Sequence, residues 1–318
     1  MPSEPGDDGL GVFRVAGKDR YLTGVEVSRL FEDGADVLYV ATGEDFADAL
    51  AAAAVAGYES APVLLTQGDR LDARVAAAVR EVAPVRIVIV GGTGAVSSGV
   101  EKSLQSLGVA DVVDRVSGSD RFGTAAALAL DAFEDSGVEV VYVASGSGYP
   151  DALAASAAAS FEGGPVLLTA KDGLPKATRD VLERLAPKRV VVVGGLGVVS
   201  AAAGDAAVGV AGSEGVRYSG ANRYATAQVV AQRVFGGHDV ALAVVASGKA
   251  FPDALTGAAF AGAKRGPVLL SDPGVLNAET AIALRDLKPG SVMIAGGKGA
   301  VSDRVMHAIS GVTGLEIR

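Results

Sequence analysis

Short apolar runs alternate with amphipathic or alanine-rich segments along the first third of the chain. The continuous apolar runs are typical of buried strands, whereas the segments between them have helical periodicity or helix-forming composition. The predicted strands cover residues 11–15, 37–42, 62–66 and 85–90. The predicted helices cover residues 21–31, 49–56, 72–82 and 98–107. This alternation predicts an α/β fold with a parallel sheet, crossover connections and helices on both faces.

The whole pattern occurs three times. The heptapeptide Arg14-Val-Ala-Gly-Lys-Asp-Arg20 returns at residues 115–121 and again at residues 217–223, with first arginines 101 and 102 residues apart. A fixed period of this length indicates three copies of one supersecondary unit. We therefore expect three tandem Rossmann-like modules with parallel sheets. Their expected boundaries are 10–108, 109–211 and 212–318.

The strand that carries the first arginine of the motif has a fourth copy at the end of the chain. Arg318 stands 101 residues after Arg217, in the same phase of the repeat. A sheet that borrows the first strand of the following repeat would leave the third module without a donor. We therefore expect Gly314–Arg318 to supply the missing strand of the third sheet.

A repeated aspartate precedes the alanine-rich helix of each copy and is always followed by Ala-Leu. It could cap the helix, because a carboxylate can accept hydrogen bonds from the free backbone N–H groups there. It could instead be a partner of the arginine motif or contact a ligand. The positions are Asp48, Asp151 and Asp253.

The second arginine of each motif follows the end of a strand, which is where open α/β sheets usually bind ligands. A guanidinium group suits carboxylates and phosphates because its forked donors can engage two oxygens at once. The alternative is a buried ion pair with the repeated aspartate. These arginines are Arg20, Arg121 and Arg223.

A glycine-rich turn between strand and helix, Gly92-Thr-Gly-Ala-Val-Ser97, resembles a dinucleotide-binding turn. However, Ser97 replaces the last glycine of that pattern, and the turn recurs in all three copies. We therefore interpret it as a tight turn in which Ser97 caps the following helix, with Ser200 and Ser302 in the same role.

Composition narrows the possible functions. The net charge of −9 argues against non-specific nucleic-acid binding, and the absence of cysteine excludes disulfides and thiol chemistry. No apolar run is long enough for a membrane helix, so no membrane insertion is expected. The two histidines, His238 and His307, lie in different phases of the repeat, and no hydrolase or metalloprotease motif is present. We therefore expect no catalytic residues, no metal and no cofactor.

Together these motifs resemble the type 2 cell wall-binding repeat, which occurs in threes in surface proteins of Gram-positive bacteria. The shared motifs are the arginine heptapeptide, Asp-Ala-Leu, Pro-Val-Leu-Leu and Val-Gly-Gly-x-Gly-x-Val-Ser or close variants, from Gly11 to Arg318. The resemblance implies three Rossmann-like modules around a pseudo-threefold axis. It also implies a secreted, non-enzymatic module that anchors non-covalently at the cell wall by binding an anionic polysaccharide or teichoic-acid-like polymer.

Carried over by position, the resemblance implies that the repeated arginines and aspartates contact the polymer. The candidates are Arg14, Arg20, Asp48, Arg115, Arg121, Asp151, Arg217, Arg223 and Asp253. It further implies a separate effector domain, which this sequence does not contain. The first eight residues lack a basic segment followed by an apolar one, so we expect no signal peptide in this sequence.

Two other functions remain open from the residues alone. One is a nucleotide-dependent enzyme that uses the glycine turns, and the other is a structural protein of a surface lattice. The helices that begin at Ala49, Ala152 and Ala254 are lined by alanine and glycine, which allows close approach of their backbones. We expect these helices to meet near the pseudo-threefold axis.

Overall fold

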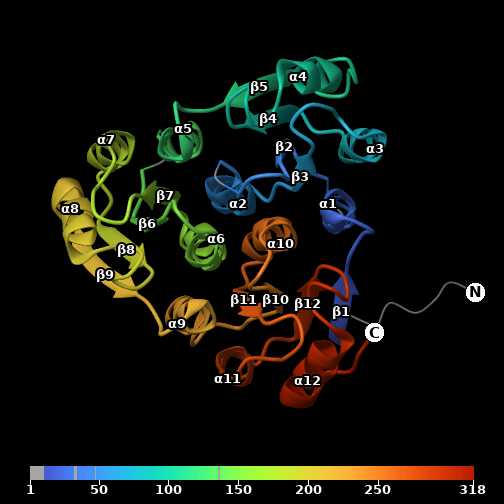
Figure 1. Cartoon of the computed structure of the whole chain (residues 1–318), viewed down its shortest axis with the longest axis vertical. Helices are drawn as coiled ribbons and strands as arrows, with labels where there is room; N and C mark the ends of the chain where they lie inside the picture. Colours follow the sequence, from blue (N-terminus) through green and yellow to red (C-terminus); the bar gives the residue numbers. More distant parts are fainter. Residues whose placement is uncertain (1–10, 32–33, 47, 135–136) are drawn as a thin grey trace, which may run out of the picture.

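The computed structural model describes residues 11–31, 34–46, 48–134 and 137–318. The first eight residues, for which no signal peptide is expected, lie outside the described part of the chain. The described residues form three parallel four-stranded sheets arranged around three central helices (Figure 1). A sheet with the four helices that pack on it is called a module below. The predicted α/β fold with three repeated modules is confirmed.

The first module contains a sheet of order β3-β2-β4-β5. Its strands are β2 (Val37–Thr42), β3 (Val63–Thr66), β4 (Arg86–Val90) and β5 (Val112–Val116). Its helices are α1 (Arg20–Ser28), α2 (Ala49–Tyr58), α3 (Ala73–Val82) and α4 (Ser98–Gln105). Every predicted element of this module is therefore present, with ends within a few residues of the expected ones.

The second module has the same order, β7-β6-β8-β9. Its strands are β6 (Val140–Ser145), β7 (Val166–Thr169), β8 (Arg189–Val193) and β9 (Glu214–Tyr218). Its helices are α5 (Arg121–Phe133), α6 (Pro150–Glu162), α7 (Lys176–Leu185) and α8 (Ala201–Ala211). The first and second sheets each end with a strand that carries the first arginine of the following repeat.

The third module takes its last strand from the start of the chain. Its strands are β10 (Leu242–Ser247), β11 (Val268–Ser271), β12 (Ser291–Ala295) and β1 (Gly11–Val15), in the order β11-β10-β12-β1. Its helices are α9 (Arg223–Phe235), α10 (Pro252–Ala263), α11 (Ala278–Leu287) and α12 (Asp303–Thr313). Strand β1 pairs in parallel with β12, so the three modules close into a ring.

The prediction that Gly314–Arg318 completes the third sheet is therefore wrong. Strand β1 already occupies that place, with Arg14 opposite Ile294 in the register. The terminal residues lie on the free edge of β1 instead, where Val12 N–H donates to the Glu316 carbonyl at 2.7 Å and Arg318 N–H donates to the Val12 carbonyl at 3.0 Å. A bridge between Val12 and Ile317 is the only pairing assigned there in the described residues, so the fourth copy is a short edge strand.

Alternation along the strands explains why helices cover both faces of each sheet. In β2, Tyr39 and Ala41 belong to the large core around the axis, whereas Leu38 and Val40 pack in a second core beneath the outer helices. Successive side chains of a strand point to opposite faces, so a run that is apolar throughout must be covered twice. Helix α2 covers the inner face, and α3 and α4 contribute to the outer core.

The three central helices, α2, α6 and α10, meet at the pseudo-threefold axis as predicted (Figure 1). All residues of α2 from Ala49 to Gly57 are buried, because neighbouring helices and the sheet surround it. Small side chains allow this close packing. Gly57, Ser160 and Gly262 occupy equivalent positions and contact one another, and Ser160 Oγ donates to the Ala54 carbonyl at 2.7 Å.

Candidate functional site

Each arginine motif connects two modules. Its strand belongs to one sheet, whereas the helix that follows it packs on the next sheet; thus β1 lies in the third sheet and α1 packs against β3 of the first. The turn between them is held by Thr23, whose hydroxyl accepts a hydrogen bond from Gly17 N–H at 3.1 Å. The acidic or amide residue before the second arginine caps the helix with its side chain. These caps are Asp19, Asp120 and Asn222.

The first arginine of each motif holds the glycine turn of the adjacent strand. Arg115 donates to the Gly91 carbonyl at 2.7 Å and pairs with Glu101 at 2.8 Å. The equivalent bonds run from Arg14 to the Gly296 and Val301 carbonyls and from Arg217 to the Gly194 and Val199 carbonyls. The arginines Arg14 and Arg115 are largely buried, with 15% and 14% of their side chains exposed. Their donors are therefore directed into the protein framework.

The second arginine of each motif is placed differently. Arg121 uses one guanidinium nitrogen to donate to the Gly146 carbonyl at 2.6 Å, and its guanidinium carbon lies 5.7 Å from the centre of the Phe46 ring. Arg20 donates in the same way to the Gly43 carbonyl at 2.6 Å, and Arg223 donates to the Gly248 carbonyl. The hydrogen bond that fixes each arginine thus goes to a backbone carbonyl and not to the repeated aspartate. The group's remaining N–H donors can serve a ligand.

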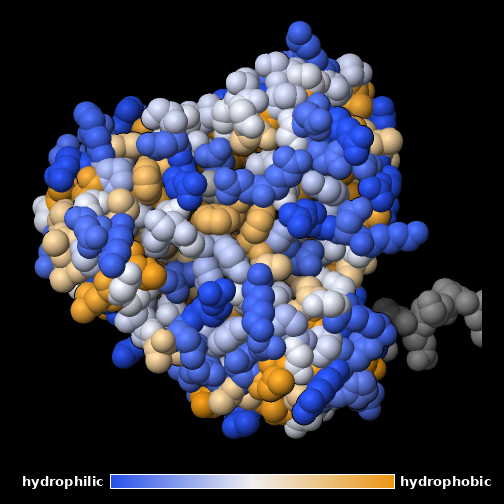
Figure 2. Space-filling view, viewed as in Figure 1, coloured by the Kyte–Doolittle hydropathy of each residue, from blue (hydrophilic) through white to orange (hydrophobic). Residues whose placement is uncertain are grey.

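Three aromatic side chains form a cluster where the central helices begin. Phe46, Tyr149 and Phe251 occupy equivalent positions in the three repeats, and their ring centres are 5.7, 5.9 and 6.1 Å apart. All three are half-buried. The guanidinium carbon of Arg223 lies 5.9 Å from the centre of the Tyr149 ring, and that of Arg121 lies 5.7 Å from the centre of the Phe46 ring. The arginines therefore extend the cluster between modules. The face viewed along the axis is largely hydrophilic, with a small apolar area near its middle (Figure 2).

Of the roles left open for the repeated aspartates, capping of the central helices by their side chains does not occur among the described residues. Asp48 stands at the cap position without a capping hydrogen bond, and Asp151 lies inside the first turn, after Pro150. Each carboxylate instead lies against the first glycine of its module's turn: a Cβ atom added to Gly194 would be 2.7 Å from Asp151 Oδ2. The equivalent pairs are Asp48 with Gly91 and Asp253 with Gly296.

Two of these aspartates, Asp151 and Asp253, also contact the arginine-motif helix of the next module. Burial raises the pKa of the Asp151 carboxyl, while the hydroxyl of Thr226 and the charge of Arg223 oppose the increase. Burial likewise raises the pKa of Asp253, opposed by Thr23 and Arg20. Asp253 Oδ1 is buried without a hydrogen-bond partner among the described residues. Within the described part of the chain, Asp253 therefore has an unoccupied carboxyl oxygen at the boundary between two modules.

The glycine turn is a structural turn, as interpreted from the sequence. Ser97 caps α4 by accepting from Val100 N–H at 3.3 Å, and Ser200 and Ser302 cap α8 and α12 in the same way. The neighbouring carboxylate of Asp48 would repel a pyrophosphate placed against Gly91. This geometry disfavours dinucleotide binding at the turn.

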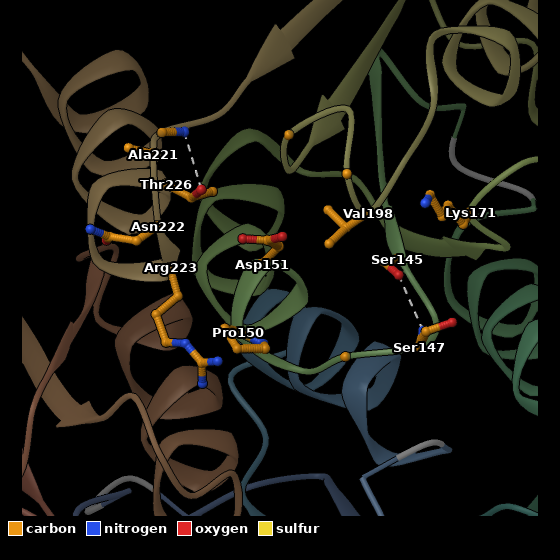
Figure 3. A pocket seen from close by; sticks show the side chains of 14 residues that line it. Ser145, Ser147, Pro150, Asp151, Lys171, Val198, Ala221, Asn222, Arg223 and Thr226 are labelled. Atoms are coloured by element: carbon orange, nitrogen blue, oxygen red, sulfur yellow. Dashed lines mark hydrogen bonds between the residues drawn. The ribbon is translucent and has the colours of Figure 1, made fainter.

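An open pocket lies at the carboxyl ends of the second module's strands (Figure 3). Its volume is about 510 Å³. Arg223 and Lys171 lie on opposite sides of Asp151 in this view, and Val198 forms part of the wall between Asp151 and Lys171. A smaller pocket of about 260 Å³ lies at the equivalent place in the first module, beside Asp48.

Sequence reasoning found the repeated arginines and aspartates but missed two sets of residues that position them. The aromatic cluster could have been found, because an aromatic residue stands two positions before every repeated aspartate. The threonine three positions after each second arginine was also visible as a repeat. These threonines are Thr23, Thr124 and Thr226. Neither pattern shows in the sequence which module its residues contact, because the contacts cross between repeats.

The fold defines a class of protein: a ring of three α/β modules that carry the same arginine and aspartate positions. Three stretches of the chain, residues 14–101, 115–203 and 217–306, match the model of cell wall binding domain 2 (CWB2). The chain therefore belongs to the CWB2 family and is associated with the cell wall.

Proteins with related sequences are known from Bacillus subtilis (strain 168). The chain is 30% identical over 298 residues to the N-acetylmuramoyl-L-alanine amidase LytC, covering 94% of this chain and 58% of the amidase. It is 29% identical over 265 residues to the amidase enhancer, covering 83% of this chain and 35% of that protein. The chain thus spans less than two thirds of either relative.

Solved structures share the arrangement of the modules. Cwp6 from Clostridium difficile superposes with a TM-score of 0.89 at 26% identity, over 96% of this chain and 48% of Cwp6. Cwp8 from the same organism gives a TM-score of 0.85 at 27% identity, over 96% of this chain and 52% of Cwp8. In the part of the chain that the structure describes, no helix is long and apolar enough to cross a lipid bilayer.

Proposed function

We propose that the chain is a non-catalytic module that holds a protein at the outside of the cell by binding an anionic cell wall polymer non-covalently. The observation that carries this proposal is the placement of the second arginines. Arg20, Arg121 and Arg223 stand at the three module boundaries, each fixed through one nitrogen to a backbone carbonyl. Their other donors are available for acidic groups of a polymer.

Repetition of the site suits a repeating ligand. Once one arginine site is occupied, a second engages the same polymer at high effective concentration, so avidity can exceed single-site affinity by roughly 10²–10⁴. The overall charge of −9 disfavours simple electrostatic capture, so local geometry has to select the ligand. The repeated aspartates would accept hydrogen bonds from hydroxyl groups, and the first arginines would hold the turns that support them.

The relatives support attachment as the role of this part of the chain. LytC is an amidase and Cwp6 is matched over 48% of its length, so both contain substantial sequence beyond the shared region. We infer that the three modules serve to localise a partner domain on the wall. A lattice-forming role is the alternative, and it would appear as concentration-dependent oligomers without affinity for the polymer.

Sedimentation with purified cell walls tests the proposal. The wild-type chain is expected to sediment with walls and to lose this association after acid extraction of the secondary polymers. Each single change of Arg20, Arg121 or Arg223 to Gln should weaken sedimentation, and the triple change should abolish it. Thermal melting is measured in parallel. A triple variant that melts like the wild type and still sediments would refute this assignment.

A further inference from the structure

The three module boundaries are built alike but carry different charges. The pocket of the first module is lined by Glu44, Asp45 and Asp48. The residues 103 positions later in the second module are Ser147, Gly148 and Asp151, which also line its pocket. Two of the three carboxylates are therefore absent from the second pocket.

The second pocket also gains a cation. Lys171 lines it at the position where the first module has Gly68. In the first module the Glu44 carboxylate occupies that place, since a Cβ atom added to Gly68 would be 3.3 Å from Glu44 Oε2. Lys171 is exposed and forms no ion pair with any residue that the structure describes. The equivalent position of the third module is Pro273. The cation nearby, Lys249, stands at the position of Ser147, and its ammonium group is paired with Asp272 at 2.6 Å.

The residues that cap the arginine-motif helices add to the difference in charge between the first and second pockets. The arginine-motif helix that borders the second pocket begins with Asn222 and Arg223, whereas the helix that follows the first module begins with Asp120 and Arg121. Asn222 caps its helix without adding a negative charge. Lys171 and Arg223 thus outweigh Asp151 in the second pocket, while carboxylates dominate the first.

We propose that the acidic group of the polymer is bound most tightly in the second-module pocket, between Lys171 and Arg223, and that the carboxylates of the first-module pocket weaken its binding there. This inference rests on the proposed function. The ligand is a repeat unit that carries an acidic group together with hydroxyls: the two cations donate to the acid, and Asp151 accepts from a hydroxyl. A phosphodiester and a uronate both have this chemistry.

A reciprocal exchange of the two turns tests the inference on the full chain. S147E/G148D gives the second pocket the acids of the first, and E44S/D45G does the reverse. The exchange is conservative because both turns have the same local bond, from Glu44 N–H to Thr42 Oγ1 and from Ser147 N–H to Ser145 Oγ, each at 3.2 Å. A Cβ atom at Gly148 would have only an ordinary contact, 3.8 Å from Pro150 Cδ.

The matched control, A77E/Q105E, adds two negative charges at exposed positions on α3 and α4, far along the chain from the second pocket. Lys171→Ala provides a second, single-site probe of the pocket. Affinity is measured by titration calorimetry against two soluble polymers, poly(glycerol phosphate) and polygalacturonate, and by sedimentation with cell walls. Melting curves establish that each variant is folded.

S147E/G148D should weaken binding about tenfold, and Lys171→Ala about threefold, because each alters one or two charges next to the ligand acid. The control and wild type should agree within about twofold, and E44S/D45G should bind at least as tightly as wild type. Binding of poly(glycerol phosphate) alone would identify a phosphodiester site, and binding of polygalacturonate alone a uronate site.

The inference is overturned if S147E/G148D binds like the control, or if E44S/D45G weakens binding as much as S147E/G148D does. Wild type that sediments with walls but binds neither soluble polymer would also overturn it. In these cases the proposed function survives, because wall association persists. If wild type fails to sediment with walls, the proposed function fails as well.

Discussion

Gly57 and Ser160 face each other at the pseudo-threefold axis so closely that a Cβ atom added to Gly57 would lie 2.5 Å from Ser160 Oγ. The same atom would lie 3.1 Å from both the Ala259 carbonyl oxygen and Gly262 Cα. The backbone of α10 therefore bounds the space on one side, and the Ser160 hydroxyl of α6 is already fixed by its bond to the Ala54 carbonyl. The central helices can pack this closely because two of the three equivalent positions, Gly57 and Gly262, lack a side chain.

Replacement of Gly57 by alanine is therefore expected to destabilise the protein by about 1–3 kcal/mol, through overpacking at the axis. Helix propensity alone predicts the opposite sign, because alanine favours a helix over glycine. Gly209→Ala in α8 is the matched control, since nothing lies within 4 Å of its added Cβ atom. It should stabilise the protein by about 0.5–1 kcal/mol. Thermal or denaturant unfolding measures both, and equal shifts for the two variants would contradict tight packing at Gly57.

Ring closure by β1 leads to a second prediction. Removal of residues 1–15 deletes β1, exposes the edge of β12 and leaves the Gly296 carbonyl without its bond from Arg14. Removal of residues 314–318 deletes only an edge strand that bonds to Val12. We expect the first deletion to destabilise the third module strongly, and the second to reduce hydrogen-exchange protection chiefly near Val12. Loss of protection throughout β12 after the shorter C-terminal deletion would contradict this interpretation.

The same two segments show how far sequence reasoning extends. Periodicity located β1 and the terminal copy correctly, because a strand's apolar pattern is local. It could not decide which of them completes the third sheet, since both have the same pattern and the contact of β1 with β12 spans some 280 residues. The lack of a following repeat favoured Gly314–Arg318, but closure of the ring brings β1 to the edge of the third sheet.

The candidate site was predictable to a similar extent. Repetition identified Arg121 and Asp151, but not the direction of their side chains. Asp151 was placed at a helix start, where capping is the usual role of a carboxylate, yet the helix begins at Pro150, two residues before the expected start at Ala152. The carboxylate then packs on Gly194, a glycine that belongs to another turn of the same module. Such contacts depend on the tertiary fold and leave no local signal.

Neutralising the glutamate is expected to change stability in opposite directions in two equivalent tyrosine–glutamate pairs. Tyr39 donates to Glu59 Oε2 at 2.6 Å, and burial raises the pKa of Glu59 although this hydrogen bond opposes the increase. Tyr142 donates to Glu162 Oε2 at 2.5 Å, but Glu162 also pairs with Arg189 at 2.7 Å. Glu59 is therefore a half-buried acid that lacks the cation its counterpart has, since Arg86 pairs with Asp114 and Asp131.

A folded-state pKa above the unfolded value means that the folded protein holds the proton more tightly. The stability from Glu59 is therefore present below its unfolded pKa, near 4.5, and is lost as the pH rises through the folded value. Glu59→Gln should raise the melting temperature at neutral pH, and the difference should shrink as the pH falls below about 4. Glu162→Gln should lower the melting temperature at neutral pH. Melting curves across this range decide the sign for each pair.

The two arginines of one motif give the last prediction, because they differ in what they hold. Arg115 bonds the Gly91 carbonyl at 2.7 Å and pairs with Glu101, and both partners lose their donor in Arg115→Gln. Loss of a partly buried, charge-assisted bond should cost about 1.5–3 kcal/mol of stability. Arg121 makes one bond to the Gly146 carbonyl and lies beside Phe46, so Arg121→Gln should cost less than about 1 kcal/mol of stability.

If Arg121 contacts the polymer, its variant should lose wall affinity at nearly unchanged stability, whereas Arg115→Gln should lose stability first and recover binding at low temperature. Unfolding and wall sedimentation, measured on both variants at two temperatures, separate these roles, and equal losses of stability would show that both arginines serve the fold.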